Sequence, residues 1–519
     1  LIFQILMQNN KDLRVIIKNC GNEYKIISPV IITQEMIENT GYFQLFKFIK
    51  QNNETVIPEA IYDYYNYPQQ KQWKNEKRKS IEQIYKEYKG KENESARRKK
   101  VKEIENFYEE NNKIDFEFDV VTQLSAPNQY SSFSKLYFNF YNNKDKFSIL
   151  IKEILKNYSN INDNEKINFN NLTGFIKEIT CLQLFNPHQG KGLNKDKANG
   201  LNATNFKNSW IAESLKVTGA LKGMICQPVK VGNSYDLKLF VPDYNEIYYD
   251  KQQELIKKFK KYIKGNTPIK IDILNSLLFI KTFIELTPEY KGCVKNTING
   301  FYSVYQKDLG QNKAVVNIAQ IQTPDFIIIN TEEDSLQWRE ILDYLITLIS
   351  RIKEQGDAIQ GLLAFRNFIS SSNIDSFFKF CRWYSIYLMQ ALAVEKYYIL
   401  PISPIFLTKI IKHMETENIK LSEITENEGF KSIAKAIRKS TVLLQYTPAE
   451  NRSFEIRYGL AQEIQNKSRS KTDFATFIGD FIGSYNAETA RAKEKTGENL
   501  RAIIKDEEIK KFVELLDKY

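Results

Sequence analysis

Histidine is nearly absent from this chain of 519 residues, which contains only His188 and His413. This scarcity excludes a three-histidine metal site, an HD phosphohydrolase and an HNH nuclease built on several histidines. The sequence also lacks a GxxxxGK[ST] phosphate-binding loop and a GxSxG nucleophile elbow. The acidic run Glu332–Glu333–Asp334 has no further carboxylates at fixed spacing, so we interpret it as a helix N-terminus rather than a magnesium site. We therefore expect a binding protein, not an enzyme, without a cofactor or metal.

Long hydrophobic runs and paired cysteines are also missing. No run of 18 or more apolar residues and no compact basic amphipathic anchor is present, so we expect no membrane partner. The N-terminus shows no signal-peptide pattern, and we expect a cytoplasmic protein. The cysteines form no CxxC pair, which favours free thiols over zinc or a disulfide framework. They are Cys20, Cys181, Cys226, Cys293 and Cys381.

Positive charge is what the chain has in excess. The formal net charge is +11 and the isoelectric point is near 9.0, which favours a polyanionic partner. A hydrophobic content of 42% and an aromatic content of 13% are sufficient for well-packed cores. The length exceeds that of one ordinary core, so we expect two or three domains.

The most polar stretch is FNPHQGKGLNKDKANGLNATNFKNSW, from Phe185 to Trp210. It is rich in Lys, Asn and Gly, and Asp196 is its only acid. Strongly patterned apolar sequence lies on both sides, so we predict a long ordered loop on a rigid base, although a flexible surface excursion is the alternative. Glycine allows close approach to a ligand, lysine binds phosphate, and asparagine can pair with base edges. These residue types are typical of nucleic-acid contact.

Residues 1–334 alternate short β-like runs with helical patterns. This mixture predicts an α+β body without the regular βαβ repeat of a doubly wound sheet. The clearest predicted strands are 115–124, 235–244 and 313–321, and the clearest predicted helices are 35–50, 147–158 and 272–286.

A charged insertion interrupts this body at about residues 69–113. The apolar spacing predicts two helices joined near Gly90–Asn93. The interleaved glutamates fit a solvated helix face, whereas the basic cluster suits a phosphate backbone. The cluster consists of Arg97, Arg98, Lys99 and Lys100.

After about residue 335 the strand pattern stops. Apolar residues recur at helical spacing through residues 335–519, which predicts an all-α bundle of five or more helices. Basic side chains beside these positions suit a nucleic-acid backbone, which needs charge and position but no base reading. The predicted contacts are Arg438, Arg452, Arg457, Lys467, Arg469, Lys471 and Arg491.

Two stretches resemble a known family. The tail RYGLAQEIQNKSRSKTDFATFIGDFIGSYNAE is similar to the small-subunit-like helices of the large subunits of type I CRISPR Cascade complexes. The segment GKGLNKDKANGL, within the polar loop, is similar to a basic loop of some of these large subunits. The order of parts, an α+β body followed by a helical bundle, also resembles theirs.

The resemblance implies a subunit of an RNA-guided DNA-targeting complex. Such a subunit reads a protospacer-adjacent motif, assists duplex opening, stabilises the R-loop, contacts the 5′ end of the guide RNA and recruits a helicase–nuclease effector. Its partners are guide RNA, target double-stranded DNA, and the backbone, handle-binding and small subunits. Motif reading and duplex opening would then fall to Asn186, His188, Gln189, Lys191, Asn194, Lys195, Lys197, Asn199 and Asn202.

Two other interpretations stay open from the sequence. One is a divergent nuclease whose acidic residues gather a metal only in three dimensions. The other is a scaffold or interaction protein whose basic charge serves solubility and protein partners. Salt dependence separates the last from a nucleic-acid binder, because phosphate contacts weaken steeply as salt rises.

Overall fold

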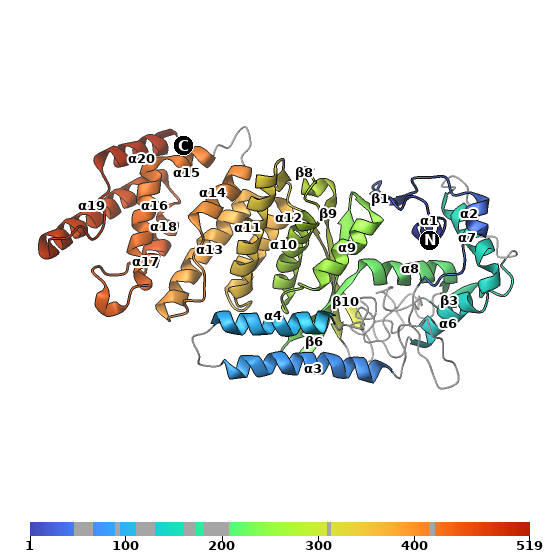
Figure 1. Cartoon of the computed structure of the whole chain (residues 1–519). Helices are drawn as coiled ribbons and strands as arrows, with labels where there is room; N and C mark the ends of the chain where they lie inside the picture. The colour runs from blue at the N-terminus through green and yellow to red at the C-terminus, as the bar shows by residue number, and fades with distance from the viewer. Residues whose placement is uncertain are drawn as a thin grey trace, which may run out of the picture. The chain divides into compact units, whose positions relative to one another are not determined.

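The computed structural model describes residues 1–45, 66–88, 94–110, 130–159, 172–180, 207–308, 313–414 and 421–518. The predicted class, α+β with a helical C-terminal region, is confirmed. The chain forms two compact units, and each is contributed by two segments of the sequence. Unit 1 contains Leu1–Lys261 and Phe301–Gln320, and unit 2 contains Tyr262–Gly300 and Ile321–Tyr519. Figure 1 shows the elements coloured along the chain.

Unit 1 mixes helices with short sheets. Its helices are α1 (Ile2–Gln8), α2 (Gln34–Glu38), α3 (Asn66–Glu87), α4 (Glu94–Glu110), α6 (Tyr130–Tyr141), α7 (Phe147–Ser159), α8 (Trp210–Gly223) and α9 (Tyr249–Lys260). Its strands are β1 (Ile16–Asn19), β2 (Tyr24–Ile27), β3 (Glu178–Thr180), β4 (Lys207–Ser209), β5 (Ile225–Val231), β6 (Ser234–Tyr244), β7 (Glu246–Tyr248), most of β9 (Ile298–Asp308) and of β10 (Lys313–Gln322).

A four-stranded sheet in the order β10-β9-β6-β5 forms the β part of unit 1. Strands β5 and β6 pair antiparallel, with Ile225 opposite Phe240. The Phe240 ring stacks between Phe301 of β9 at 4.6 Å and Phe259 of α9 at 6.0 Å. These ring contacts stabilise the packing of α9 on the sheet, because buried aromatic rings remove apolar area from water and also stack on one another. A second sheet has the order β2-β1-β7.

Most elements that we predicted in this unit are present. Strands 235–244 and 313–321 correspond to β6 and β10, and helix 147–158 corresponds to α7. The two helices of the charged insertion are α3 and α4. The predicted strand 115–124 lies outside the described residues.

The helix that we predicted at 35–50 is wrong from residue 39 to residue 45. Helix α2 ends at Glu38, and residues 39–45 are not helical. The hydroxyl of Thr40 donates to the carbonyl of Met36 at 2.6 Å, and Gly41 follows directly. A side chain that bonds back to the preceding turn, followed by glycine, competes with helix propagation, so the apolar spacing alone is misleading here.

Unit 2 is mainly helical. Its helices are α10 (Pro268–Leu286), α11 (Glu332–Arg351), α12 (Ala358–Ser371), α13 (Ile374–Ala393), α14 (Pro404–His413), α15 (Leu421–Glu426), α16 (Glu428–Ser440), α17 (Val442–Gln445), α18 (Leu460–Lys467), α19 (Lys471–Thr496) and α20 (Asp506–Lys518). The strands β8 (Gly292–Cys293) and β11 (Ile328–Ile329) pair antiparallel. The predicted bundle of five or more helices after residue 335 is confirmed.

Helix α10 lies in the interior of unit 2. Its central residues are buried on every side, as expected for a helix with apolar residues all round. It packs against α11 and α12, and α12 packs in turn against α13 (Figure 1). The ammonium of Lys281 on α10 pairs with Asp343 of α11 at 2.7 Å. The helix predicted at 272–286 is therefore confirmed, with its N-terminal turn beginning at Pro268.

The C-terminal module, residues 428–518, has a core of its own within unit 2. Helices α16, α18, α19 and α20 pack around buried apolar side chains that include Ile433, Phe481 and Phe512. Asn427 caps α16 by accepting from Phe430 N at 3.0 Å and also donates to the carbonyl of Lys511 on α20 at 3.2 Å. These contacts explain why the tail holds together as one packed group of helices.

Candidate nucleic-acid interface

The ends of the polar loop are held together. Strands β3 and β4 pair antiparallel, with Thr180 opposite Lys207, and residues 181–206 connect them. Trp210 follows at the start of α8, fully buried, and its ring stacks on Phe175 at 5.1 Å and meets the edge of Phe140 at 5.1 Å. The strands on either side of residues 181–206 therefore rest on a packed support. The nine predicted loop residues, from Asn186 to Asn202, lie outside the described residues.

A buried carboxylate ties β4 to the first turn of α8. Glu213 is fully buried, and its Oε1 accepts from Asn208 Nδ2 at 2.8 Å and from Lys216 Nζ at 2.9 Å. The amide oxygen of Asn208 accepts in turn from Ser209 N at 2.9 Å. A buried charge is tolerated only where it is paired and hydrogen-bonded, so this arrangement fixes the C-terminal end of the loop. Our sequence analysis did not find Glu213, although an acid in the first helical turn after a polar loop is a usable signal.

The basic cluster of the charged insertion is divided between faces of α4. Arg97 lies over the ring of Tyr85 on α3 at 5.2 Å, and Lys100 lies over Tyr88 at 5.5 Å. Residues three apart share a helix face, so these two side chains lie together over Tyr85 of α3 and over Tyr88, which follows α3 directly. Lys99 is exposed, and the side chain of Arg98 lies outside the described part of the chain. Lys100 is also exposed, so the contact of this cluster with a phosphate backbone stays a prediction.

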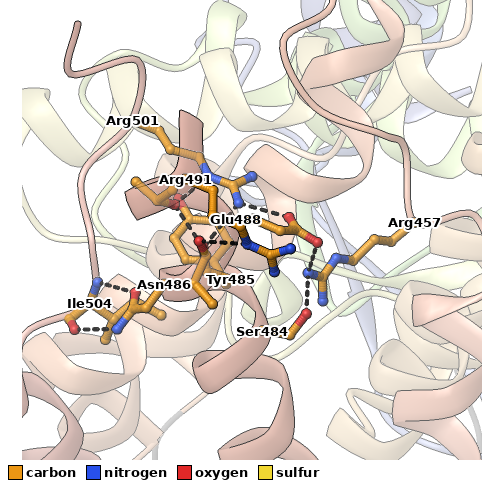
Figure 2. Close-up of polar contacts among 10 residues, drawn as sticks. Arg457, Ser484, Tyr485, Asn486, Glu488, Arg491, Arg501 and Ile504 are labelled. Atoms are coloured by element: carbon orange, nitrogen blue, oxygen red, sulfur yellow. Dashed lines mark hydrogen bonds and ion pairs between the residues drawn. The ribbon is translucent and has the colours of Figure 1, made fainter. Parts of the chain in front are cut away.

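Arg457 of the predicted set is already paired within the protein. Its guanidinium donates to Glu488 Oε1 at 2.6 Å and to Ser484 Oγ at 2.8 Å (Figure 2). It also lies over the Phe481 ring, 5.2 Å from the ring centroid. The Glu488 carboxylate also pairs with Arg501, so it offsets only part of the charge, but it holds the guanidinium against the module and makes Arg457 a weaker candidate for a phosphate contact. By contrast, Arg438 and Arg452 donate to main-chain carbonyl oxygens, which leaves their net charge in place.

Three predicted cations converge at the junction of α18 and α19. Lys467, Arg469 and Lys471 lie within one short turn, and all three are exposed. Asp517, at 4.0 Å from Lys471, is the one carboxylate within ion-pair distance of the three among the residues that the structure describes. Arg491 lies further along α19, about 30 Å from Lys471 at a rise of about 1.5 Å per residue. Exposed positive charge thus lies near both ends of α19: Lys467, Arg469 and Lys471 near its start, and Arg491, Lys493 and Lys495 near its end.

Arg501 is the strongest polar anchor of the C-terminal module, and our sequence analysis missed it. Its guanidinium lies between the rings of Phe454, at 3.7 Å, and Tyr485, at 3.9 Å. It donates to Glu488 Oε2 at 2.9 Å, to Thr489 Oγ1 at 2.7 Å and to the carbonyl of Tyr485 (Figure 2). Glu488 therefore joins Arg501 to Arg457. Nothing in the local sequence distinguishes this arginine from its solvated neighbours.

The acidic run at the start of α11 is a helix cap, as we predicted. The Asp334 carboxylate accepts from the main-chain N–H groups of Asn330 and Thr331, and Thr331 Oγ1 accepts from Asp334 N. The hydrogen bond from Asn330 is the main cause that lowers the pKa of Asp334. Within the described ranges, no group of three His, Cys, Asp or Glu side chains could hold a metal ion.

Two further observations concern the chain as a whole. Within the described ranges, none of the helices is both long enough and apolar enough to cross a membrane. No protein-family model and no curated protein matches this sequence.

Proposed function

We propose that this chain is the non-catalytic large subunit of an RNA-guided DNA-targeting complex of the type I CRISPR Cascade kind. In this role it reads the protospacer-adjacent motif, assists duplex opening, stabilises the R-loop, contacts the 5′ end of the guide RNA and recruits a helicase–nuclease. It acts in the cytoplasm. The proposal rests on the resemblance of the loop and the tail, because guide pairing supplies sequence specificity in such complexes and the protein supplies charge and a short motif reader.

The observation that carries the proposal is the support under the loop. A loop rich in Gly, Asn and Lys can read base edges only if its ends are fixed relative to the protein. Thr180 and Lys207 pair at its two ends, and Trp210 and Glu213 anchor the following helix in the core. The exposed cations at the start of α19 supply a separate group of charges that suits a phosphate backbone.

Neutralising Lys467, Arg469 and Lys471 with glutamine weakens duplex binding and flattens its salt dependence. Each phosphate contact contributes about 0.9 to the slope of log K against log salt, so the slope falls by about 3 for three contacts. Fluorescence anisotropy with a short labelled duplex between 50 and 200 mM salt measures both quantities.

The matched control removes the same charge elsewhere in the same module. Lys431, Lys435 and Lys510 are exposed, and their replacement with glutamine leaves the start of α19 intact. Equal losses from the two triple variants mean that net charge alone drives binding, which contradicts the proposed contact site. A chain whose duplex binding does not change with salt supports the scaffold interpretation instead.

A further inference from the structure

A cluster of exposed tyrosines in unit 2 belongs to neither the loop nor the start of α19. Tyr397 and Tyr398 follow α13, and Tyr446 follows α17. Their exposed fractions are 48%, 56% and 42%, and the rings of Tyr397 and Tyr446 are 6.0 Å apart. We call these three residues the tyrosine platform. Large apolar side chains gathered at the surface indicate a binding site, whereas single ones do not.

The segment that carries two of these rings is held firmly. Ile399 is fully buried directly after them. The hydroxyl of Tyr384 on α13 donates to the carbonyl of Leu400 at 2.6 Å, and the hydroxyl of Tyr344 on α11 donates to the carbonyl of Pro401. The segment is thus fastened to two helices. The exposure of Tyr397 and Tyr398 is therefore a property of a fixed surface rather than of a loose chain.

The hydroxyl groups of the platform are not used to hold the fold together. Among the described residues, none of the three hydroxyl groups of the platform forms a hydrogen bond. Tyrosines that serve the fold normally use this group, as Tyr344 and Tyr384 do. The rings of Tyr397 and Tyr446 contact each other at 6.0 Å yet stay 48% and 42% exposed, so part of their surface is open to a ligand.

Three arginines surround the platform with uncompensated charge. Arg351 donates to the carbonyl of Tyr398 at 2.6 Å, and Arg438 donates to that of Ile402 at 3.3 Å. Arg452 donates to the carbonyls of Leu444 and Thr447 at 3.1 and 2.8 Å, on either side of Tyr446. In the part of the chain that the structure describes, none of the three pairs with a carboxylate, unlike Arg457 and Arg501.

Binding to main-chain oxygen positions each guanidinium without cancelling its charge. A guanidinium has five N–H donors, and these bonds leave most of them available. Lys396, beside Tyr397, is also exposed, with Glu395 as the acid next to it. The surface therefore combines flat aromatic faces with fixed cations.

We propose that the tyrosine platform binds single-stranded nucleic acid, with unpaired bases stacked on the rings and phosphates on Arg351, Arg438 and Arg452. Every base has a stackable face, so such binding tolerates any sequence, and the cations follow the backbone. A duplex does not fit this chemistry, because its bases are already stacked on one another. A protein partner would need carboxylates placed opposite three separate arginines. A nucleic-acid backbone instead carries negatively charged phosphates at regular spacing.

This inference deepens the proposed function and rests on it in one respect, because the R-loop named there contains a displaced single strand that the platform would hold. The loop and the start of α19 concern duplex DNA and phosphate contacts, whereas the platform concerns unpaired bases. It does not require a guide RNA, so it can fail while the proposed function holds, and the reverse is also true.

The test compares two triple variants of the full chain. Replacing Tyr397, Tyr398 and Tyr446 with leucine keeps apolar bulk but removes the flat rings, and replacing them with phenylalanine keeps the rings. The probes are labelled 20-nucleotide oligothymidylate, oligouridylate of equal length and a 20-base-pair duplex. We expect the leucine variant to bind at least one single strand about 10- to 100-fold more weakly, the phenylalanine variant to bind within about twofold of the original, and duplex binding to be unchanged.

A cross-linking measurement locates the contact independently. A single strand carrying 5-iodouracil is irradiated on the original chain, and the cross-linked peptides are sequenced. Cross-links at the platform support the proposal. The substitution experiment has its own control, Tyr458→Leu, because Tyr458 is an exposed tyrosine of unit 2 outside the platform and its replacement should leave single-strand binding unchanged. Unchanged single-strand binding of the leucine triple variant, cross-links only at other sites, or no single-strand binding by the original chain overturns the proposal.

Discussion

Replacing Arg501 with methionine lowers the free energy of opening of the C-terminal module by about 3 kcal/mol. Only 4% of the Arg501 side chain is exposed, and its guanidinium lies between two aromatic rings while it donates to Glu488, Thr489 and Tyr485. Methionine restores apolar contact but supplies none of these donors. Hydrogen exchange of the amides in α19 and α20, measured in the full chain, reports this local opening.

Arg491 gives the matched control for this prediction. It lies on the same helix, α19, but is exposed, and its Nε donates only to the carbonyl of Ala487 at 3.3 Å. We expect Arg491→Met to change the opening free energy by no more than about 0.5 kcal/mol, as for other surface substitutions. Equal effects of the two substitutions would show that Arg501 is not the anchor we describe.

Adding a single methyl group at Gly429 separates α16 from α20. A Cβ at this position would lie 2.1 Å from the carbonyl oxygen of Glu508 and 2.6 Å from the amide nitrogen of Phe512. Both are backbone atoms, so the two helices must move apart rather than one side chain rotate. We expect Gly429→Ala to destabilise the module by about 1–3 kcal/mol, the usual range for overpacking.

We expect the same substitution at Gly483 to change the stability of the module in the opposite direction. Gly483 lies inside α19, and a Cβ there meets no atom within 4 Å. Alanine is a better helix former than glycine by about 1 kcal/mol, so Gly483→Ala should stabilise the module. The pair of variants is measured by the same exchange experiment. A Gly429→Ala variant as stable as the original chain would contradict the close crossing of α16 and α20.

Periodicity in the sequence predicted elements whose burial follows a simple pattern. The strand β6, which is buried along most of its length, and the helix α7, which buries an apolar stripe, were found because strand-forming residues and helical apolar spacing dominate these two stretches. The helix predicted at 35–50 is shorter in the structure, because the hydrogen bond from the Thr40 hydroxyl to the Met36 carbonyl competes with continuation of α2. Such a local side-chain bond leaves no trace in the spacing of apolar residues.

The position of α10 shows a second limit. Its apolar residues indicate a buried helix but not the unit in which it is buried. It precedes β9 and β10 in the sequence, yet it packs with α11 and α12. The choice depends on contacts between segments that are distant in the chain, which local patterns do not encode.

The sequence predicted which basic residues are candidates for the interface, but not which of them form ion pairs within the protein. The basic residues of the tail lie on helices or in the segments between them, and only three-dimensional contacts separate Arg457, paired with Glu488, from exposed Arg469. The tyrosine platform draws on segments around Tyr397 and Tyr446 that have no common motif. Charged residues can be counted from a sequence, but the sequence does not show which cations pair with carboxylates in the folded chain.

Recovery of RNA with the protein tests the central claim most directly. The chain is expressed with a purification tag together with its neighbouring genes, and any RNA that accompanies it is sequenced. The proposed function predicts a uniform population of short RNAs, each with a constant 5′ end and a variable remainder. A preparation that contains neither RNA nor partner subunits would contradict it.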